Sequence, residues 1–174
     1  MFGKPRQLDT ESELYDVAVR ALMRRAHSVH EMKKLLARRA DNELLVQVVM
    51  ARLKENGQLD DARYAKQFVR QRTTIRRQGK FRIARDLRAR GIPDLHVDAA
   101  IGEAADPEAE SATIRTRIQR KLKLLSGKKR AELDDRKIAS LYRSLLRLGF
   151  ASDAIRRELK SITTEEVPEV DASE

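Results

Sequence analysis

Residues 57–91 read GQLDDARYAKQFVRQRTTIRRQGKFRIARDLRARG, and this stretch decides the fold and carries the chain's charge imbalance. Between Arg63 and Arg90 there are eleven basic residues, whereas Asp86 is the only acid. The local excess therefore equals the formal net charge of the whole chain, +10, and all other residues together balance to zero. The basic residues are Arg63, Lys66, Arg70, Arg72, Arg76, Arg77, Lys80, Arg82, Arg85, Arg88 and Arg90.

The stretch predicts two consecutive amphipathic helices. Asp60 is typical of a residue that caps a helix start, and Asp61 places a favourable negative charge in the first turn. On a helical wheel, the apolar face holds Tyr64, Ala65, Phe68, Val69 and Ile75, opposite an arc of Arg63, Lys66, Arg70 and Arg77. Gln78 and Gly79 break the pattern. The next helix, residues 80–90, is expected to bury Ile83, Ala84 and Leu87 and to turn Phe81, Arg82, Arg85 and Arg88 outward.

Further helices are predicted on both sides of this pair. Ser28 with Glu31 three residues later forms a capping box for the second of three helices that precede it. The expected ranges are 11–25, 28–39, 42–56, 93–101, 106–126, 133–148 and 152–161. Aromatic residues make up 4% of the chain and charged residues 37%, which favours thin helical layers over one thick core. The predicted fold class is all-α, an elongated array.

An internal repeat organises these helices. Adding 58 to Ile83, Leu87, Gly91, Ile92, Val97 and Ile101 gives Leu141, Leu145, Gly149, Phe150, Ile155 and Leu159. Subtracting 51 from the main positions gives Met32, Leu36, Ala40, Val46 and Met50. The sequence therefore predicts three tandem three-helix repeats at 11–56, 57–104 and 106–162. Residues 1–10 and 163–174 are expected to be flexible.

Arg72 and its repeat equivalent Arg25 both fall on an apolar face. A charge there is costly unless it is paired or reaches water along the side-chain stem. The favoured interpretation is a guanidinium that bonds a carboxylate or the carbonyls of a helix end. A contact of Arg72 with a ligand is the alternative.

Several function classes find no support in the sequence. The chain has no cysteine, so it has neither a disulfide framework nor thiolate chemistry. No apolar run has the length of a signal peptide or a membrane span, so a cytoplasmic protein without membrane contact is expected. His27, His30 and His96 are scattered and favour solvated or capping roles over metal binding. We predict no enzyme activity, no cofactor and no metal.

The basic faces predict a polyanionic partner. Eleven neighbouring cations with one acid repel one another unless an anion neutralises them, although a merely solvated face remains an alternative. A second basic set lies between Arg115 and Arg130. DNA is the first candidate, bound without sequence specificity because no recognition helix or aromatic stacking platform is evident; an acidic protein surface is the second. The candidate residues are Arg63, Lys66, Arg70, Arg77, Lys80, Arg82, Arg85, Arg88, Arg115, Lys121, Lys128, Lys129 and Arg130.

Over residues 12–162 the chain resembles the RecX family of bacterial recombination regulators. The resemblance rests on residues 57–65, 79–92, 28–36 and 148–155, and the Leu-Asp-Asp-x-x-Tyr-Ala element at 59–65 is its most specific part. Residues 40–42 depart from the pattern, because the other two repeats have a glycine-type turn there. The basic turn at 127–130 matches no family motif.

The resemblance implies three tandem repeats in an extended, curved molecule that binds the RecA filament on DNA. It implies a regulator that lowers RecA ATP hydrolysis, strand exchange and cleavage of the SOS repressor during DNA repair and recombination. It also implies a protein without catalysis or cofactor, and we expect a monomer. The alternatives are a protein that binds bare single- or double-stranded DNA, and a helical scaffold whose basic face is only solvated. A further hypothesis is that the acidic residues 165–174 shield the basic surface when no partner is bound.

Overall fold

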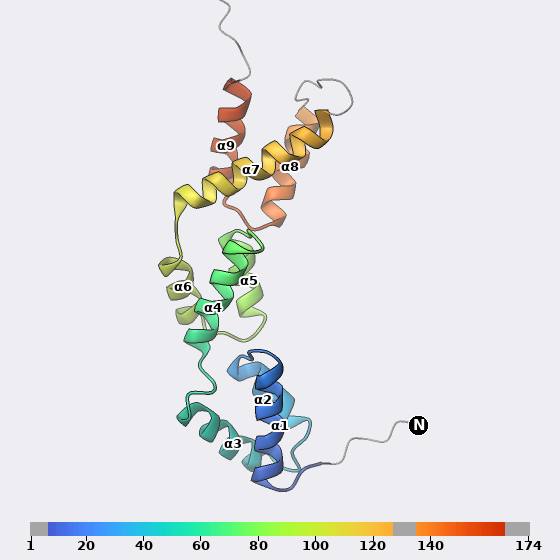
Figure 1. The fold of residues 1–174 in the computed structure, drawn as a ribbon, viewed down its shortest axis with the longest axis vertical. Helices are drawn as coiled ribbons and strands as arrows, with labels where there is room; N and C mark the ends of the chain where they lie inside the picture. Colours follow the sequence, from blue (N-terminus) through green and yellow to red (C-terminus); the bar gives the residue numbers. More distant parts are fainter. Residues whose placement is uncertain (1–6, 127–134, 166–174) are drawn as a thin grey trace, which may run out of the picture. The chain divides into compact units, whose positions relative to one another are not determined.

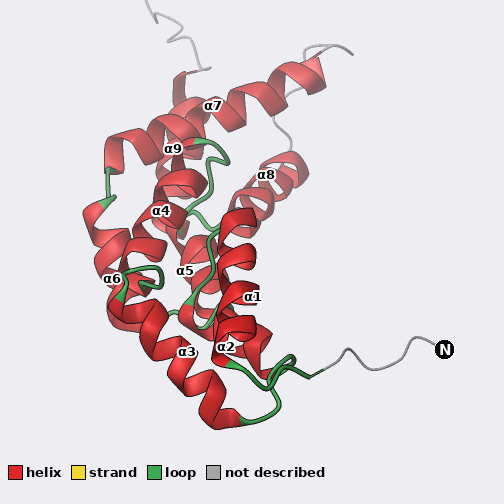
Figure 2. Cartoon of the chain, turned by 60° about the horizontal axis from the view of Figure 1, so that its bottom comes forward, coloured by secondary structure: helices red, strands yellow, loops and turns green. Residues whose placement is uncertain are grey.

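The structure, a computed structural model, describes residues 7–126 and 135–165, and this part of the chain is all-α (Figure 1). The only β-type pairing in these ranges is an isolated bridge between Leu8 and Ala40, so no strand is drawn (Figure 2). The predicted all-α class is confirmed. The helices are α1 (Glu11–Arg24), α2 (Val29–Ala37), α3 (Glu43–Glu55), α4 (Asp61–Thr74), α5 (Lys80–Arg88), α6 (Asp94–Glu103), α7 (Pro107–Ser126), α8 (Asp135–Arg147) and α9 (Ser152–Glu165).

Local side chains fix most helix starts. The predicted capping box of α2 is present, since Ser28 Oγ accepts the N–H of Glu31 at 3.0 Å and a Glu31 carboxylate oxygen accepts the N–H of Ser28 at 3.3 Å. Asp60 caps α4 as predicted, because its carboxylate accepts the N–H of Arg63 at 2.9 Å. Asn42 and Asp106 accept backbone N–H groups in the same way. Each of these bonds satisfies a helix-start donor that has no partner within the helix.

Two helix ends show why the repeat pattern contains glycine. Gly91 follows α5 with φ +75°, and Gly149 follows α8 with φ +87°, both in the left-handed region. In both places the next residue donates back to the helix: Ile92 to the carbonyl of Leu87 at 3.2 Å, and Phe150 to that of Leu145 at 3.3 Å. The residues that the repeat makes equivalent therefore have the same backbone conformation.

The chain divides into two compact units, with boundaries inside α4, inside α5 and between α6 and α7. Unit 1 comprises residues 1–71 and 84–104, and unit 2 comprises residues 72–83 and 105–174. In unit 1, α1 and α2 both pack against α3. The core between them consists of Leu14, Ala18, Met32, Leu36, Ala40, Val46, Val49, Met50, Leu53 and Leu59.

In unit 2, α7 and α8 both pack against α9. The two isoleucines that α7 contributes, Ile114 and Ile118, are almost fully buried. The core of unit 2 consists of Ile114, Ile118, Leu141, Leu145, Phe150, Ala151, Ala154, Ile155 and Leu159.

One prediction about α4 was wrong. The wheel placed Ile75 on the buried face, but α4 ends at Thr74 and the Ile75 side chain is 75% exposed. Arg77 has a φ of +50°, which is outside the helical region, so the helical wheel does not apply to the residues after Thr74. Ala65, Phe68 and Val69, which belong to the helix itself, are buried as predicted.

Candidate polyanion-binding surface

The candidate basic residues of unit 1 lie on α4 and α5, and tertiary structure supplies several of them with acids. Lys66 Nζ lies 2.7 Å from the Glu103 carboxylate, and Arg88 Nε lies 2.6 Å from that of Asp94. Arg88 also lies 3.8 Å from Asp98, and Arg85 lies 3.5 Å from Asp86. Three of these four acids, Asp94, Asp98 and Glu103, belong to α6, which lies outside the basic stretch between Arg63 and Arg90. The expectation that only Asp86 is available was therefore wrong.

These ion pairs leave the cations accessible. The side chains of Lys66, Arg85 and Arg88 are 56%, 71% and 51% exposed. Exposed pairs contribute about 0–1 kcal/mol each, because water screens the charges and two long side chains lose rotamer freedom. Arg63 is also exposed, and its guanidinium donates to the carbonyl of Gly57. An external anion can exchange for such partners at small cost.

Glu31 joins the start of α2 to the end of α5 within unit 1. One of its oxygens lies 2.7 Å from Arg90 Nη1, and the other lies 2.8 Å from Arg25 Nη1. Burial opposes the charged form of Glu31, but hydrogen bonds from Arg25 and Ser28 and the charge of Arg90 outweigh it and lower the pKa. Arg25 also donates to the carbonyl of Ala26 at 3.0 Å, which confirms the favoured interpretation of that arginine.

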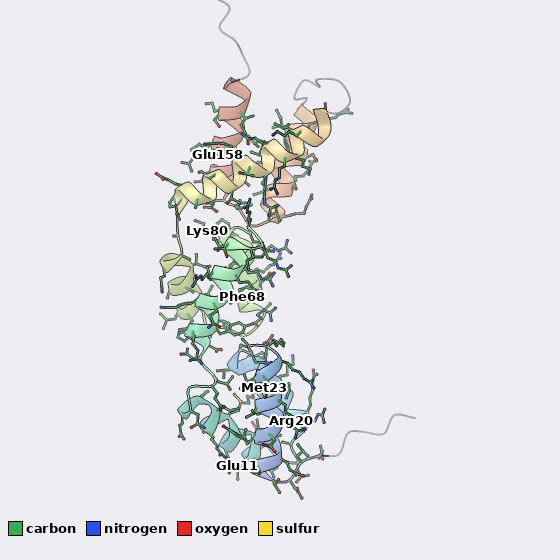
Figure 3. The ribbon with its side chains drawn as sticks, in the orientation of Figure 1. Glu11, Arg20, Met23, Phe68, Lys80 and Glu158 are labelled. Atoms are coloured by element: carbon green, nitrogen blue, oxygen red, sulfur yellow. The ribbon has the colours of Figure 1, made fainter. Side chains whose placement is uncertain are left out.

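Two more long-range bonds complete this junction. Ser28 Oγ donates to the carbonyl of Arg90 at 2.6 Å, and the N–H of Val29 donates to the Asp61 carboxylate at 2.9 Å. Asp61 therefore binds the first residue of α2, a role that sequence reasoning missed. The guanidinium of Arg90 lies 5.2 Å from the ring centre of Phe68, labelled in Figure 3. Arg90 is thus held by Glu31 and by the ring of Phe68, so its charge stabilises the fold of unit 1.

In unit 2, the start of α5 is fastened to the turn after α8. The N–H of Gly79 donates to Leu148 at 2.9 Å, and that of Phe81 donates to Gly149 at 3.0 Å. Arg82 Nη1 donates to the carbonyl of Arg147 at 3.3 Å, and the side chain is half-buried. The prediction that Arg82 faces outward was therefore only partly right. Lys80, labelled in Figure 3, is exposed.

The second basic set divides into two kinds of residue. Arg115 Nε lies 3.0 Å from a carboxylate oxygen of Glu158, whose side chain is 6% exposed, so this arginine neutralises a buried acid on α9 (Figure 3). Removing such a partner leaves an uncompensated buried charge, so Arg115 is a structural residue. Lys121 is exposed on α7. Lys128, Lys129 and Arg130 lie outside the described residues.

Arg117, which was not among the candidate residues, ties α7 to the loop between α4 and α5. Its Nη2 donates to the carbonyls of Arg76 and Arg77 at 3.0 and 3.1 Å. Burial lowers the pKa of Arg117, and the positive charges of Arg77 and Arg120 lower it further. Its neighbourhood within unit 2 is therefore strongly cationic.

The histidines show no catalytic or metal-binding arrangement. His27 is buried, and its Nδ1 lies 3.0 Å from the carbonyl of Arg25, the C-cap residue that follows α1. Burial lowers the pKa of His27. Across the described ranges, no group of three histidine, aspartate or glutamate side chains could hold a metal ion. Nor does any helix in those ranges have the length and apolarity to cross a membrane.

The helices and the cationic side chains define a helical-array protein with basic faces on both units. Residues 60–101 match the family model described as RecX, second three-helix domain. The regulatory protein RecX of Halorhodospira halophila is 36% identical over 142 residues, which cover 81% of this chain and 83% of that protein. The chain belongs to the RecX family of regulatory proteins.

Other relatives and solved structures agree. The regulatory protein RecX of Chlorobium phaeobacteroides is 29% identical over 152 residues, covering 87% of this chain and 95% of that protein. The crystal structure of RecX from Lactobacillus salivarius superposes with a TM-score of 0.76 at 19% identity, covering 88% of this chain and 97% of that one. A second crystal structure, of a regulatory protein RecX, gives a TM-score of 0.73 at 19% identity, over 86% and 71% of the two chains. These structures share the fold.

Proposed function

We propose that this chain binds the RecA filament on DNA and inhibits RecA ATP hydrolysis, strand exchange and cleavage of the SOS repressor. Membership of the RecX family carries this proposal, and the exposed cations of α4 and α5 support it. The chain acts by binding rather than by catalysis, as a monomer in the cytoplasm. The three predicted repeats, 11–56, 57–104 and 106–162, are its proposed functional divisions.

The contacts of the basic residues suit a filament that presents phosphates and acidic protein groups together. Lys66 and Arg88 already hold carboxylates of α6 through exposed ion pairs. A phosphate or a carboxylate of the partner can replace these acids without leaving a buried charge behind, since both members of each pair remain in water. Binding of this kind weakens steeply as salt rises, because each neutralised phosphate releases counterions.

The test is a titration of RecA-coated single-stranded DNA that follows ATP hydrolysis. The expected result is loss of RecA ATPase activity at substoichiometric amounts of this chain. The charge-reversal variant Arg70→Glu/Arg85→Glu should inhibit more weakly, since both residues are exposed on α4 and α5. The matched control Arg20→Glu/Arg38→Glu carries the same charge change on exposed residues elsewhere in unit 1 and should inhibit normally. Unchanged ATPase activity at saturating protein would refute the proposal.

Binding of bare DNA without sequence specificity is the second candidate, favoured by the exposed side chains of Lys66, Arg85 and Arg88. It predicts equal affinity for naked and RecA-coated DNA, whereas the first proposal predicts a clear preference for the coated strand. If Arg70→Glu/Arg85→Glu binds and inhibits like the original chain, the basic face of α4 and α5 is merely solvated and takes part in neither kind of binding.

A further inference from the structure

Unit 2 contains a cationic hollow of about 540 Å³ between the loop after α4 and helices α7 and α8. We call it the basic hollow. Within it, Arg117 holds the loop by donating to the carbonyls of Arg76 and Arg77. The lining residues are Ile75, Arg76, Arg77, Thr116, Arg117, Ile118, Arg120, Lys121, Leu141, Ser144, Leu145 and Leu148.

The described residues leave the charge of the basic hollow uncompensated. Five of its lining residues are basic, and no described acid lines it. Among the residues that the structure describes, no carboxylate lies within ion-pair distance of Arg76, Arg77, Arg120 or Lys121. The buried Nε–H of Arg117 has no hydrogen-bond acceptor in the same part of the chain. In unit 1, by contrast, α6 supplies acids to Lys66 and Arg88.

The rest of the lining is aliphatic. Ile75, Ile118, Leu141, Leu145 and Leu148 contribute to it, and none of the lining residues that the structure describes is aromatic. Ile75 is 75% exposed, an unusual position for a large apolar side chain. Single-stranded nucleic acids bind through basic grooves whose aromatic side chains stack on the bases. Cations beside aliphatic groups suit an acidic peptide with aliphatic side chains better.

The chain itself carries such a peptide. Residues 166–174 read EVPEVDASE, with four acids, two valines and no basic residue. Arg115 and Glu158 join α7 to α9 seven residues before α9 ends at Glu165, so the segment starts about 10 Å of helix beyond that contact. Nine residues can span up to about 30 Å when extended. The segment is therefore long enough to return along α7.

We propose that residues 166–174 bind in the basic hollow of unit 2. The acids Glu166, Glu169 and Asp171 pair with the arginines and Lys121, and Val167 or Val170 lies against the aliphatic lining. The bound segment covers Arg77 and Lys121 until a stronger polyanion displaces it. This goes beyond the proposed function and does not depend on RecA, because both partners belong to this chain.

A single spin label tests the contact in the full chain. The chain has no cysteine, so Ser173→Cys provides one attachment site for a nitroxide. The measurement is the loss of methyl signal intensity at Ile75, Leu141, Leu145 and Leu148 in nuclear magnetic resonance spectra. A reference chain with Glu166→Gln, Glu169→Gln, Asp171→Asn and Glu174→Gln reports the loss due to the tether alone.

The expected result is a larger loss in the original chain than in the neutralised reference, removed by Arg120→Ser/Lys121→Ser and by high salt. The control Arg143→Ser/Arg157→Ser makes the same charge change on exposed residues of α8 and α9 and should keep the loss. Equal losses in the original and reference chains would overturn the proposal. A second result would also overturn it: methyl signals of the hollow that show no loss from the spin-labelled segment but shift when an oligothymidine is added. That result would make the basic hollow a nucleic-acid site. A functional full-length RecA assay plays no part in the readout, so failure here leaves the proposed function standing.

Discussion

A single carboxylate, that of Glu31, makes three contacts in unit 1. It closes the capping box of α2 and pairs with both Arg25 and Arg90. We expect Glu31→Gln to lower the free energy of unfolding by about 1–3 kcal/mol at pH 7, because it weakens a cap and two charge-assisted bonds. Urea unfolding followed by circular dichroism measures this. Glu55→Gln is the control, since Glu55 is exposed and no described cation pairs with it.

The pH dependence of the same variant follows from its pKa. The folded pKa of Glu31 lies below the unfolded value, so the unfolded chain binds more protons as the pH falls. The stabilisation is complete above the ordinary carboxyl value of about 4.3 and is lost as pH falls through the folded pKa. The stability difference between the original chain and Glu31→Gln should therefore shrink below about pH 4. A difference that stays constant down to pH 3 would contradict the role given to the charge.

Gly79 is required by a close backbone approach. A Cβ there would lie 2.2 Å from the carbonyl oxygen of Gly149 and 2.4 Å from the nitrogen of Phe150. Gly79→Ala should destabilise unit 2 by about 2 kcal/mol or more, because both backbone bonds to residues 148 and 149 must shift. Gly102→Ala is the matched change, since nothing lies within 4 Å of its Cβ and it sits inside α6. It should stabilise by up to about 1 kcal/mol through helix propensity. Thermal unfolding of the two variants separates these outcomes.

At the scale of elements, α6 sets how much positive charge α4 and α5 present. Asp94→Asn/Glu103→Gln removes acids that hold Arg88 and Lys66. We expect tighter binding of single-stranded oligonucleotides and a salt slope steeper by about 0.7 for each cation that gains a phosphate. Stability should change by about 1 kcal/mol or less, because the pairs are exposed.

The control for this prediction is Asp16→Asn/Glu55→Gln, which removes the same charge from exposed residues of α1 and α3. Fluorescence anisotropy over a series of salt concentrations measures both affinities. If the control raises affinity as much as the α6 variant does, general charge explains the effect and the ion pairs of α6 do not.

The helices could be predicted from the sequence because their signals are local. A capping side chain and the N–H from which it accepts are three residues apart, as in Ser28 with Glu31, so spacing and periodicity locate the helix start. The partners of the charged residues could not be predicted in this way. Asp61 binds Val29 from 32 positions away, and Glu103 reaches Lys66 only after α6 has folded onto α4. The contacts of Arg117 could not be predicted for the same reason, because an acceptor of its guanidinium, the carbonyl of Arg77, lies on a loop forty residues earlier.

At the scale of the whole molecule, the chain has a net charge of +10 and an acidic segment at 166–174, and the question is how this segment lowers the affinity for polyanions. The segment can lower this affinity in two ways, which give different results. Through long-range electrostatic attraction, it would lower the affinity for any polyanion by the same factor whatever residues line the basic hollow. By occupying the hollow, it would lower the affinity only while the hollow binds the segment. A double-mutant cycle distinguishes them, since independent sites give additive free energies and sites in contact do not.

The cycle combines neutralisation of the four acids between Glu166 and Glu174 with Arg120→Ser/Lys121→Ser. In the original chain, neutralisation should raise the affinity for a single-stranded oligonucleotide at low salt, because Arg77 and Lys121 become available to phosphates. In the Arg120→Ser/Lys121→Ser chain the same neutralisation should change affinity much less, since the segment has lost its site. In the Arg143→Ser/Arg157→Ser chain the full gain should remain, because those exposed arginines lie outside the hollow. Equal gains in all three chains would show that the segment acts through net charge alone.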